Sequence, residues 1–378
     1  MGKNPPNITV IVPTFNRAQY LAECLDSILA QTLPAAQIIV INDGSKDRTK
    51  DICDSYRGKI EYYELNQVGK PSAINYGLKK AKGEYIWIFD DDDVALTEAL
   101  ERFVEPLEKN SAYGFSYSTF YFTSSGADGR IGPINFELRI PDLEARGFLI
   151  PLLEANFLGG AALFARAACY RAVGDFDPAL LRSQDYEMAV RLARRFPGIR
   201  VAGPGTFHYR QHAGERGATQ DRFAVDERKR KWLEYDQKFF CKFYQEFPLA
   251  DYLPPGHSLD KKKRQALLQR LAIMSYKLLL PEVIKDLREL AATNDPAPIS
   301  AEEYFIIREM MLRVPRHEAG AVYDHMEFFD EIRRLASASP VMRLVRTKFV
   351  RALLARFRNR LEFLQLPGTF WRIVRLYI

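Results

Sequence analysis

Residues 8–13 of this chain, ITVIVP, form an almost continuous series of apolar, mostly β-branched side chains. Such a run is typical of a strand that is buried on both faces of a parallel sheet. A second run of this kind, IIVI at residues 38–41, follows a stretch in which apolar positions recur at helical spacing between residues 20 and 29. Strand, helix and strand in this order predict a βαβ unit and therefore an α/β fold.

The alternation continues with a helix at 49–56, a strand at 59–65, a helix at 71–81 and a strand at 84–89. This order predicts a doubly wound, mostly parallel sheet whose strand ends share one edge.

From residue 113 the pattern changes. Residues 113–132 predict strand and loop, residues 148–154 and 185–195 predict helices, and residues 199–209 predict a last strand. After about residue 223, the spacing of apolar residues predicts mainly helices. We therefore expect an α/β domain over 1–222, a helical region over 223–340 and a basic tail over 341–378.

The 378 residues, 47% of them hydrophobic, are enough for a sizeable core. No apolar run is long enough to span a bilayer, and the first residues are a polar lead-in without a secretory pattern. The cysteines have no metal or redox spacing and are expected to be reduced thiols, namely Cys24, Cys53, Cys169 and Cys241. These features predict a cytoplasmic protein.

The net charge of +6 is concentrated in residues 341–378, which carry nine Lys or Arg and a single Glu. A general nucleic-acid-binding surface is therefore a poor explanation of the basic character, and no nucleic-acid partner is expected. Apolar positions recur at helical spacing within 342–366, with arginines between them. Such a helix suits peripheral contact with an anionic membrane at the inner face of the cell membrane, or packing on its own domain or on a second subunit in a homodimer.

Four consecutive carboxylates, at residues 90–93, follow the strand at 84–89 directly. Adjacent carboxylates repel one another, so a positive partner is expected there. Mg²⁺ and Mn²⁺ take one or two carboxylates together with substrate phosphates. The run predicts a metal and diphosphate site; the alternative is a solvated acidic turn that caps the next helix.

The ends of the other predicted strands also carry polar residues, at 13–16, 42–45 and 66–70. Asp43 could accept a hydrogen bond from a base N–H, the backbone near Thr14 could hold the base or ribose, and Lys70 could reach a phosphate. Alone, Asp43 reads as a turn residue and Lys70 as a surface lysine. Their placement at successive strand ends favours a nucleotide site.

These elements together resemble a family 2 glycosyltransferase with the nucleotide-sugar-binding GT-A fold. The matching segments are IVPTFNR (11–17), INDGSKD (41–47), NQVGKPSAINYGL (66–78), GEYIWIFDDDD (83–93), GGAALFAR (159–166), VGDFDPALLRSQDYEMAVRLA (173–193) and YRQH (209–212). The resemblance implies an enzyme that moves a sugar from a nucleoside diphosphate donor to an acceptor hydroxyl on a glycan or lipid-linked molecule, with inversion. UDP is the favoured nucleotide, and TDP offers the same N–H.

The resemblance also implies roles for particular residues. Asp92 is the expected ligand of Mn²⁺ or Mg²⁺, and His212 could complete the metal shell, although a lone histidine is often structural. Asp90 is expected to contact the ribose or a metal-bound water, and Arg210 the diphosphate. The full set of expected donor contacts is Pro13, Thr14, Asn16, Asp43, Lys70, Asp90, Asp91, Gly160 and Arg210.

A single displacement with inversion needs one general base for the incoming hydroxyl. Asp185 matches the family's position for it, with Glu187 as the second candidate; the alternative for Asp185 is a helix N-cap. The family commonly has Glu-Asp at this point, whereas this chain has Gln184 before Asp185.

Two other classes stay open. A nucleotidyltransferase would use a nucleotide pocket and acidic metal ligands but would leave the Asp185 segment unexplained. A non-catalytic nucleotide-sugar-binding scaffold is the other, because a fold does not guarantee an activity. A processive membrane synthase is disfavoured, because RKRKW at 228–232 lacks the Gln and Arg of the Gln-x-x-Arg-Trp motif.

Overall fold

The computed structural model describes residues 5–126, 129–211, 228–293, 295–313, 326–337 and 339–357. The chain divides into two compact units, which we call the α/β unit and the helical unit. The α/β unit comprises Met1–Leu143 and Ala155–Lys229, and the helical unit comprises Glu144–Glu154 and Arg230–Ile378.

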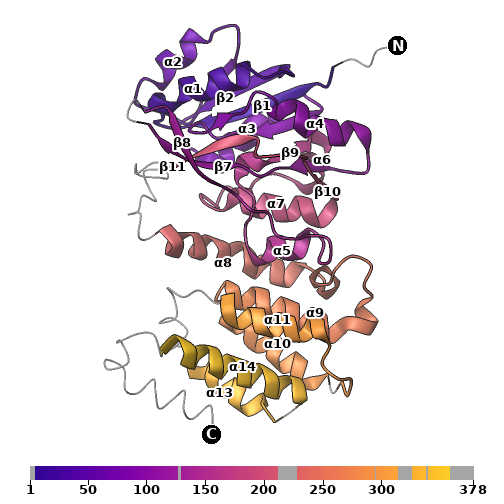
Figure 1. Cartoon of the computed structure of the whole chain (residues 1–378). Helices are drawn as coiled ribbons and strands as arrows, with labels where there is room; N and C mark the ends of the chain where they lie inside the picture. Colours follow the sequence, from indigo (N-terminus) through magenta and orange to yellow (C-terminus); the bar gives the residue numbers. More distant parts are fainter. Residues whose placement is uncertain are drawn as a thin grey trace. The chain divides into compact units, whose positions relative to one another are not determined.

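A seven-stranded sheet forms the centre of the α/β unit (Figure 1). Its strands, in spatial order, are β10 (Gly198–Arg200), β6 (Phe115–Tyr117), β9 (Leu163–Arg166), β4 (Tyr85–Ile88), β1 (Ile8–Thr14), β2 (Gln37–Asn42) and β3 (Glu61–Glu64). All neighbours are parallel except β9, which is antiparallel to both β4 and β6. Every residue of β1, β2 and β4 is buried, which confirms the prediction of a mostly parallel sheet covered on both faces.

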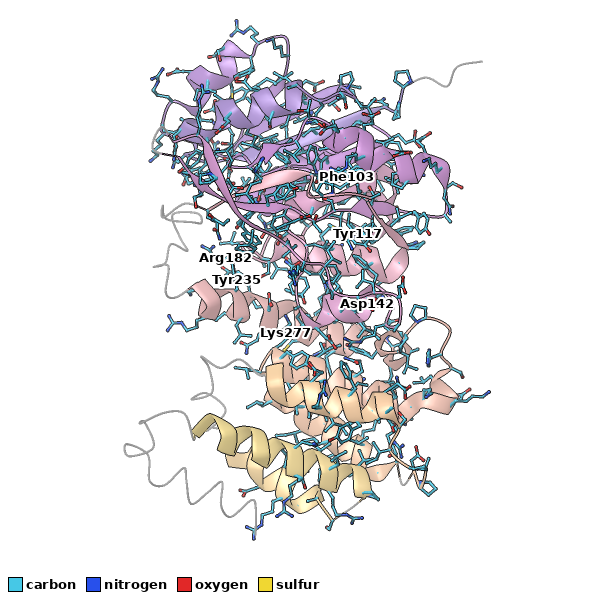
Figure 2. The ribbon with its side chains drawn as sticks, viewed as in Figure 1. Phe103, Tyr117, Asp142, Arg182, Tyr235 and Lys277 are labelled. Carbon is cyan, nitrogen blue, oxygen red and sulfur yellow. The ribbon has the colours of Figure 1, made fainter. Side chains whose placement is uncertain are left out.

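Helices cover this sheet: α1 (Ala18–Leu29), α2 (Thr49–Ser55), α3 (Lys70–Lys80), α4 (Ala99–Lys109), α6 (Ala167–Val173) and α7 (Gln184–Arg195). Helix α4 buries Phe103, labelled in Figure 2, which stacks on Phe164 and lies against Trp87. The Trp87 indole N–H donates to the Ala161 carbonyl at 2.7 Å. This hydrogen bond and the aromatic packing join β4, the strand that precedes the acidic run, to the segment that follows Gly160.

A smaller sheet contains β5 (Val94–Ala95), β11 (Phe207–Gln211), β7 (Tyr121–Ser125) and β8 (Ile131–Glu137), in this spatial order. The expectation of a single strand over 199–209 is wrong, because β10 belongs to the large sheet and β11 to the small one. The segment between them includes Gly203, with a φ of 86°, and Pro204, which has no N–H to donate. A regular ladder cannot pass through such a pair.

The described helices of the helical unit are α5 (Leu149–Glu154), α8 (Arg228–Glu246), α9 (Leu259–Tyr276), α10 (Leu280–Ala292), α11 (Ala301–Arg313), α13 (Met326–Leu335) and α14 (Pro340–Phe357) (Figure 1). Helix α9 packs against α10 and α11. Buried ion pairs tie the unit together: Arg264 meets Glu303 at 2.7 Å, and Lys277, labelled in Figure 2, meets Asp236 at 2.8 Å.

The beginning of the basic tail is part of this unit. Helix α14 packs against α11, α13 and α10, and it buries Val341, Met342 and Val345. This is the packing on its own domain that the sequence left open. The rest of the predicted amphipathic stretch, from residue 358, lies outside the described residues. Among the described helices, none has the length and hydropathy needed to cross a membrane.

Candidate active site

The carboxyl ends of β1 and β2 meet in register, with Pro13 opposite Ile41 and Thr14 opposite Asn42. The loops that follow these strands are tied together through Asn16. Its backbone N–H donates to Ser45 Oγ, and its side-chain Oδ1 accepts from the Lys46 N–H, each at 2.8 Å. Asn16 has a φ of 52°, a conformation that asparagine tolerates better than most residues. The predicted base-binding loops are therefore held by their own hydrogen bonds.

Asp43 fixes the next strand-end loop. Its buried carboxylate accepts hydrogen bonds from the backbone N–H groups of Val68 at 2.7 Å and Gly69 at 2.8 Å. Burial raises the pKa of Asp43, and these two hydrogen bonds act against that rise. Asp43 thereby sets the path of the chain into α3, where Lys70 begins the helix. Its contact with a base N–H stays a prediction.

Lys70 reaches the acidic run and forms an ion pair with Asp90, with Nζ 2.6 Å from Oδ1. Burial by itself would lower the pKa of Lys70, but Asp90, with smaller contributions from Asp185 and Asp92, raises it above its ordinary value. Lys70 is therefore a fixed cation beside both Asp90 and Asp185.

Carboxylate oxygens of Asp90, Asp92 and Asp93 lie within 4.8 Å of one another. Asp93 is buried and accepts the backbone N–H of Arg210 at 3.0 Å, whereas Asp90 and Asp92 are half-buried. Asp92 Oδ2 lies 3.8 Å from Arg17 Nη1. An all-oxygen cluster of this kind fits Mg²⁺ or Mn²⁺, with Asp90 and Asp92 as the carboxylates open to an ion.

Asp91 is buried, unlike its neighbours Asp90 and Asp92, and no residue in the described part of the chain hydrogen-bonds to its Oδ2 atom. Burial raises the pKa of Asp91 to about 7, with a further contribution from Asp92, while Arg17 and the Thr14 hydroxyl lower it. The Thr14 Oγ1 atom is likewise buried, and within the described ranges it has no hydrogen-bond partner. The predicted donor contacts Thr14 and Asp91 therefore form one buried polar spot, although their contact with a donor is untested.

The contacts of the Arg210 side chain differ from those predicted. Its side chain is 0% exposed, and its guanidinium donates to the Asp92 carbonyl at 2.7 Å, to the Gly129 carbonyl at 2.9 Å and to the Glu23 carboxylate. It also lies over the Tyr20 ring. This corrects the expectation that Arg210 is available to the diphosphate, because the cation is used to fix the backbone of the acidic run.

Replacing Arg210 by Gln is therefore expected to lower the free energy of unfolding by roughly 3 kcal/mol, because it leaves Glu23 without its buried partner. Urea denaturation followed by circular dichroism measures the change. The matched control is Arg48→Gln, since the Arg48 side chain is 84% exposed and should contribute less than about 0.5 kcal/mol. Equal stability of the two variants would contradict this assignment.

A small cavity of about 30 Å³ joins the acidic run to α7. Lys70, Asp90, Gln184 and Asp185 line it together with mainly apolar side chains. Gly160 also lines it, and a Cβ atom added there would lie 3.6 Å from Asp185 Oδ2. Four predicted site residues, Lys70, Asp90, Gly160 and Asp185, are thus brought together around one space.

Asp185 is the second residue of α7, and Ser183, with a φ of 55°, takes the N-cap position. The N-cap alternative for Asp185 is therefore wrong. Burial raises the pKa of Asp185, and Lys70 lowers it. Glu187, the second candidate base, is buried and forms a two-pronged ion pair with Arg191 at 2.7 and 2.8 Å. Of the two carboxylates, only Asp185 lines the cavity.

His212, the second predicted metal ligand, lies outside the described residues, and β11 ends at Gln211. His208 lies in β11, where its Nδ1 atom is 3.1 Å from Thr123 Oγ1 and burial lowers the pKa of the ring. The role of His212 stays a prediction.

Known proteins share this architecture. The structure of Staphylococcus aureus TarS 1-349 in complex with UDP-GlcNAc aligns with a TM-score of 0.53 at 15% identity and covers 95% of this chain and 92% of that one. The mannosyltransferase PcManGT from Pyrobaculum calidifontis, in complex with GDP-Man and Mn²⁺, aligns with a TM-score of 0.50 at 18% identity, over 92% and 88% of the two chains. The fold is of the GT-A type.

The sequence comparisons then give the family. A model of glycosyl transferase family 2 matches residues 9–171. An uncharacterized glycosyltransferase of Rickettsia felis is 32% identical over 194 residues, which are 51% of this chain and 32% of that protein. The match therefore spans about a third of that relative's length. Residues 9–171 are a family 2 glycosyltransferase domain, as the motifs predicted.

Sequence reasoning missed the positions of Arg17 and Glu23 in this site. Arg17 was within a matched segment, but nothing in the sequence paired it with Asp92. Glu23 lies on α1, 187 residues before Arg210, and no motif in the sequence links the two residues.

Proposed function

We propose that the chain is a metal-dependent, inverting glycosyltransferase that uses a nucleoside diphosphate sugar. The observation that carries the proposal is the convergence of Asp90, Lys70, Gly160 and Asp185 on one cavity at the strand ends of the family 2 domain. UDP is the proposed nucleotide, in line with the sugar nucleotide bound to TarS 1-349. The proposed acceptor is a hydroxyl of a glycan or a lipid-linked saccharide.

In this proposal the Asp185 carboxylate removes the proton from the acceptor hydroxyl as that oxygen attacks the anomeric carbon. The bond between the anomeric carbon and the diphosphate oxygen breaks in the same step, and the diphosphate leaves with the electron pair. One displacement of this kind inverts the anomeric centre. Lys70 holds positive charge between Asp90 and Asp185, which favours the ionised form of the base.

Asp92 and Asp90 would hold Mn²⁺ or Mg²⁺ in this proposal, with Asp93 and Arg210 fixing the backbone of the run. A bound divalent ion supplies Lewis-acid stabilisation of the charge that develops on the departing diphosphate. The buried contacts of Arg210 and Asp93 leave Asp90 and Asp92 pre-positioned for this task.

Isothermal titration calorimetry with UDP, TDP and GDP, each with and without Mn²⁺, tests the donor class. UDP should bind more tightly with the ion present, and an Asp92→Asn variant should lose that difference. A protein that binds none of the three nucleotides under either condition would refute the proposal.

The lack of a side chain at Gly160 should matter for turnover rather than for folding. Gly160→Ala should keep most of the activity, because its Cβ would make only an ordinary 3.6 Å contact with Asp185. Gly160→Val should lower the rate at least tenfold, since its methyl groups would fill the cavity beside the base. The rates of nucleoside diphosphate release and the melting temperatures of both variants measure this, and equal rates would contradict it.

A further inference from the structure

Gln184 is the first residue of α7, and it is 6% exposed. Its amide oxygen, Oε1, is buried and has no hydrogen-bond partner among the described residues, although Gln184 lines the same cavity as Asp185 and Gly160. A buried carbonyl oxygen without a donor destabilises the folded protein, so nearly all such groups in native proteins have partners. None of the residues that the structure describes therefore satisfies this oxygen.

The surroundings of Gln184 specify what kind of partner fits. Lys70 is the cation of the cavity, and it is already paired with Asp90 at 2.6 Å. The amide of Gln184 is neutral, so it does not compete with Asp90 and Asp185 for that cation. An unpaired, neutral acceptor next to the proposed base suits a neutral donor, which on a carbohydrate is a hydroxyl group.

We infer that Gln184 is a specificity-determining residue whose Oε1 atom accepts a hydrogen bond from a sugar hydroxyl beside the reacting centre. This inference rests on the proposed function. The hydroxyl belongs either to the donor sugar or to the acceptor sugar, and both present the same chemistry to the amide.

Replacement of Gln184 by Met tests the inference, because Met has a similar volume but no hydrogen-bonding amide. Calorimetry should be done with UDP and with the UDP-sugar that the wild-type enzyme turns over. The dissociation constant for UDP divided by that for the UDP-sugar isolates the contribution of the sugar. If the hydroxyl is on the donor, Gln184→Met should reduce this ratio about five- to tenfold while leaving UDP binding unchanged. If it is on the acceptor, both binding constants should stay the same and the KM for the acceptor should rise by a similar factor with kcat changed less.

Two further measurements separate recognition from a structural role. The ligand-free Gln184→Met protein should melt at the same or a higher temperature than the wild type, because a buried unpaired oxygen has been removed. Gln184→Asn, which keeps a neutral acceptor oxygen, should restore the sugar-dependent ratio or the acceptor KM toward the wild-type value. A lower melting temperature for Gln184→Met, or unchanged donor ratio and acceptor KM, would overturn the inference. If the wild-type protein does not bind UDP, the result would instead refute the proposed function on which this inference rests.

Discussion

Asp185→Asn is expected to lower the rate of sugar transfer roughly 1000-fold, which is within the range that general-base catalysis contributes. Asn has nearly the same shape but cannot take a proton from the acceptor. Asp185 also lines the cavity beside Lys70 and Gly160. The rate of nucleoside diphosphate release in the presence of acceptor measures the loss, and Asp175→Asn, which changes a 62%-exposed carboxylate in the same unit, should retain the wild-type rate.

Asp185→Asn is also expected to affect the thermal stability of the protein. Burial raises the pKa of Asp185, so the ionised carboxylate destabilises the folded state at pH values above that raised pKa. At neutral pH, Asp185→Asn should therefore melt at the same or a higher temperature than the wild type. Transfer by the wild type should fall as the pH is lowered through the raised pKa, since the base must be ionised. An inactive variant with a lower melting temperature would point to a structural role instead.

Asp92→Asn is expected to abolish the stimulation by Mn²⁺ and to lower turnover by about 100- to 1000-fold. Lewis-acid stabilisation by a bound ion contributes several kcal/mol, and each 1.36 kcal/mol corresponds to a factor of ten in rate. Titration of the initial rate against Mn²⁺ at a fixed donor concentration measures the effect. Asp54→Asn, which changes an exposed acid on α2, is the control.

A variant of Asp92 that keeps the Mn²⁺ response of the wild type would remove this residue from the metal site. The role would then fall to Asp90 and Asp93, whose oxygens belong to the same cluster. Because Asp93 is buried and bonded to the Arg210 backbone, such a result would also require that loop to rearrange.

The central sheet could be predicted because strands that are buried on both faces consist mainly of apolar residues. Strands β1, β2 and β4 are buried along their whole length, and in the sequence each is a mainly apolar run. Parallel strands then place their polar ends at one edge, so the closeness of Asp43, Lys70 and Asp90 followed from their order along the chain.

The misses have physical causes. Residues 199–209 were expected to form one strand, but a local sequence does not record which sheet a strand joins. Arg210 appeared free to meet a phosphate, because a sequence does not show that a cation is fully buried against Glu23 and the backbone of the acidic run. Whether Gln184 Oε1 has a partner among the described residues is decided by its three-dimensional surroundings. The spacing of residues along the sequence does not reveal those surroundings.

Turnover of a nucleotide sugar at the Asp185 cavity is the most direct test of the proposed function. Purified protein with Mn²⁺ or Mg²⁺ should be screened against a panel of UDP-, TDP- and GDP-sugars, with release of free nucleoside diphosphate as the signal and with Asp185→Asn and Asp92→Asn in parallel. We predict metal-dependent release from one donor, lost in both variants. Release of pyrophosphate in place of a nucleoside diphosphate, or turnover that survives in both variants, would contradict the proposed glycosyltransferase function.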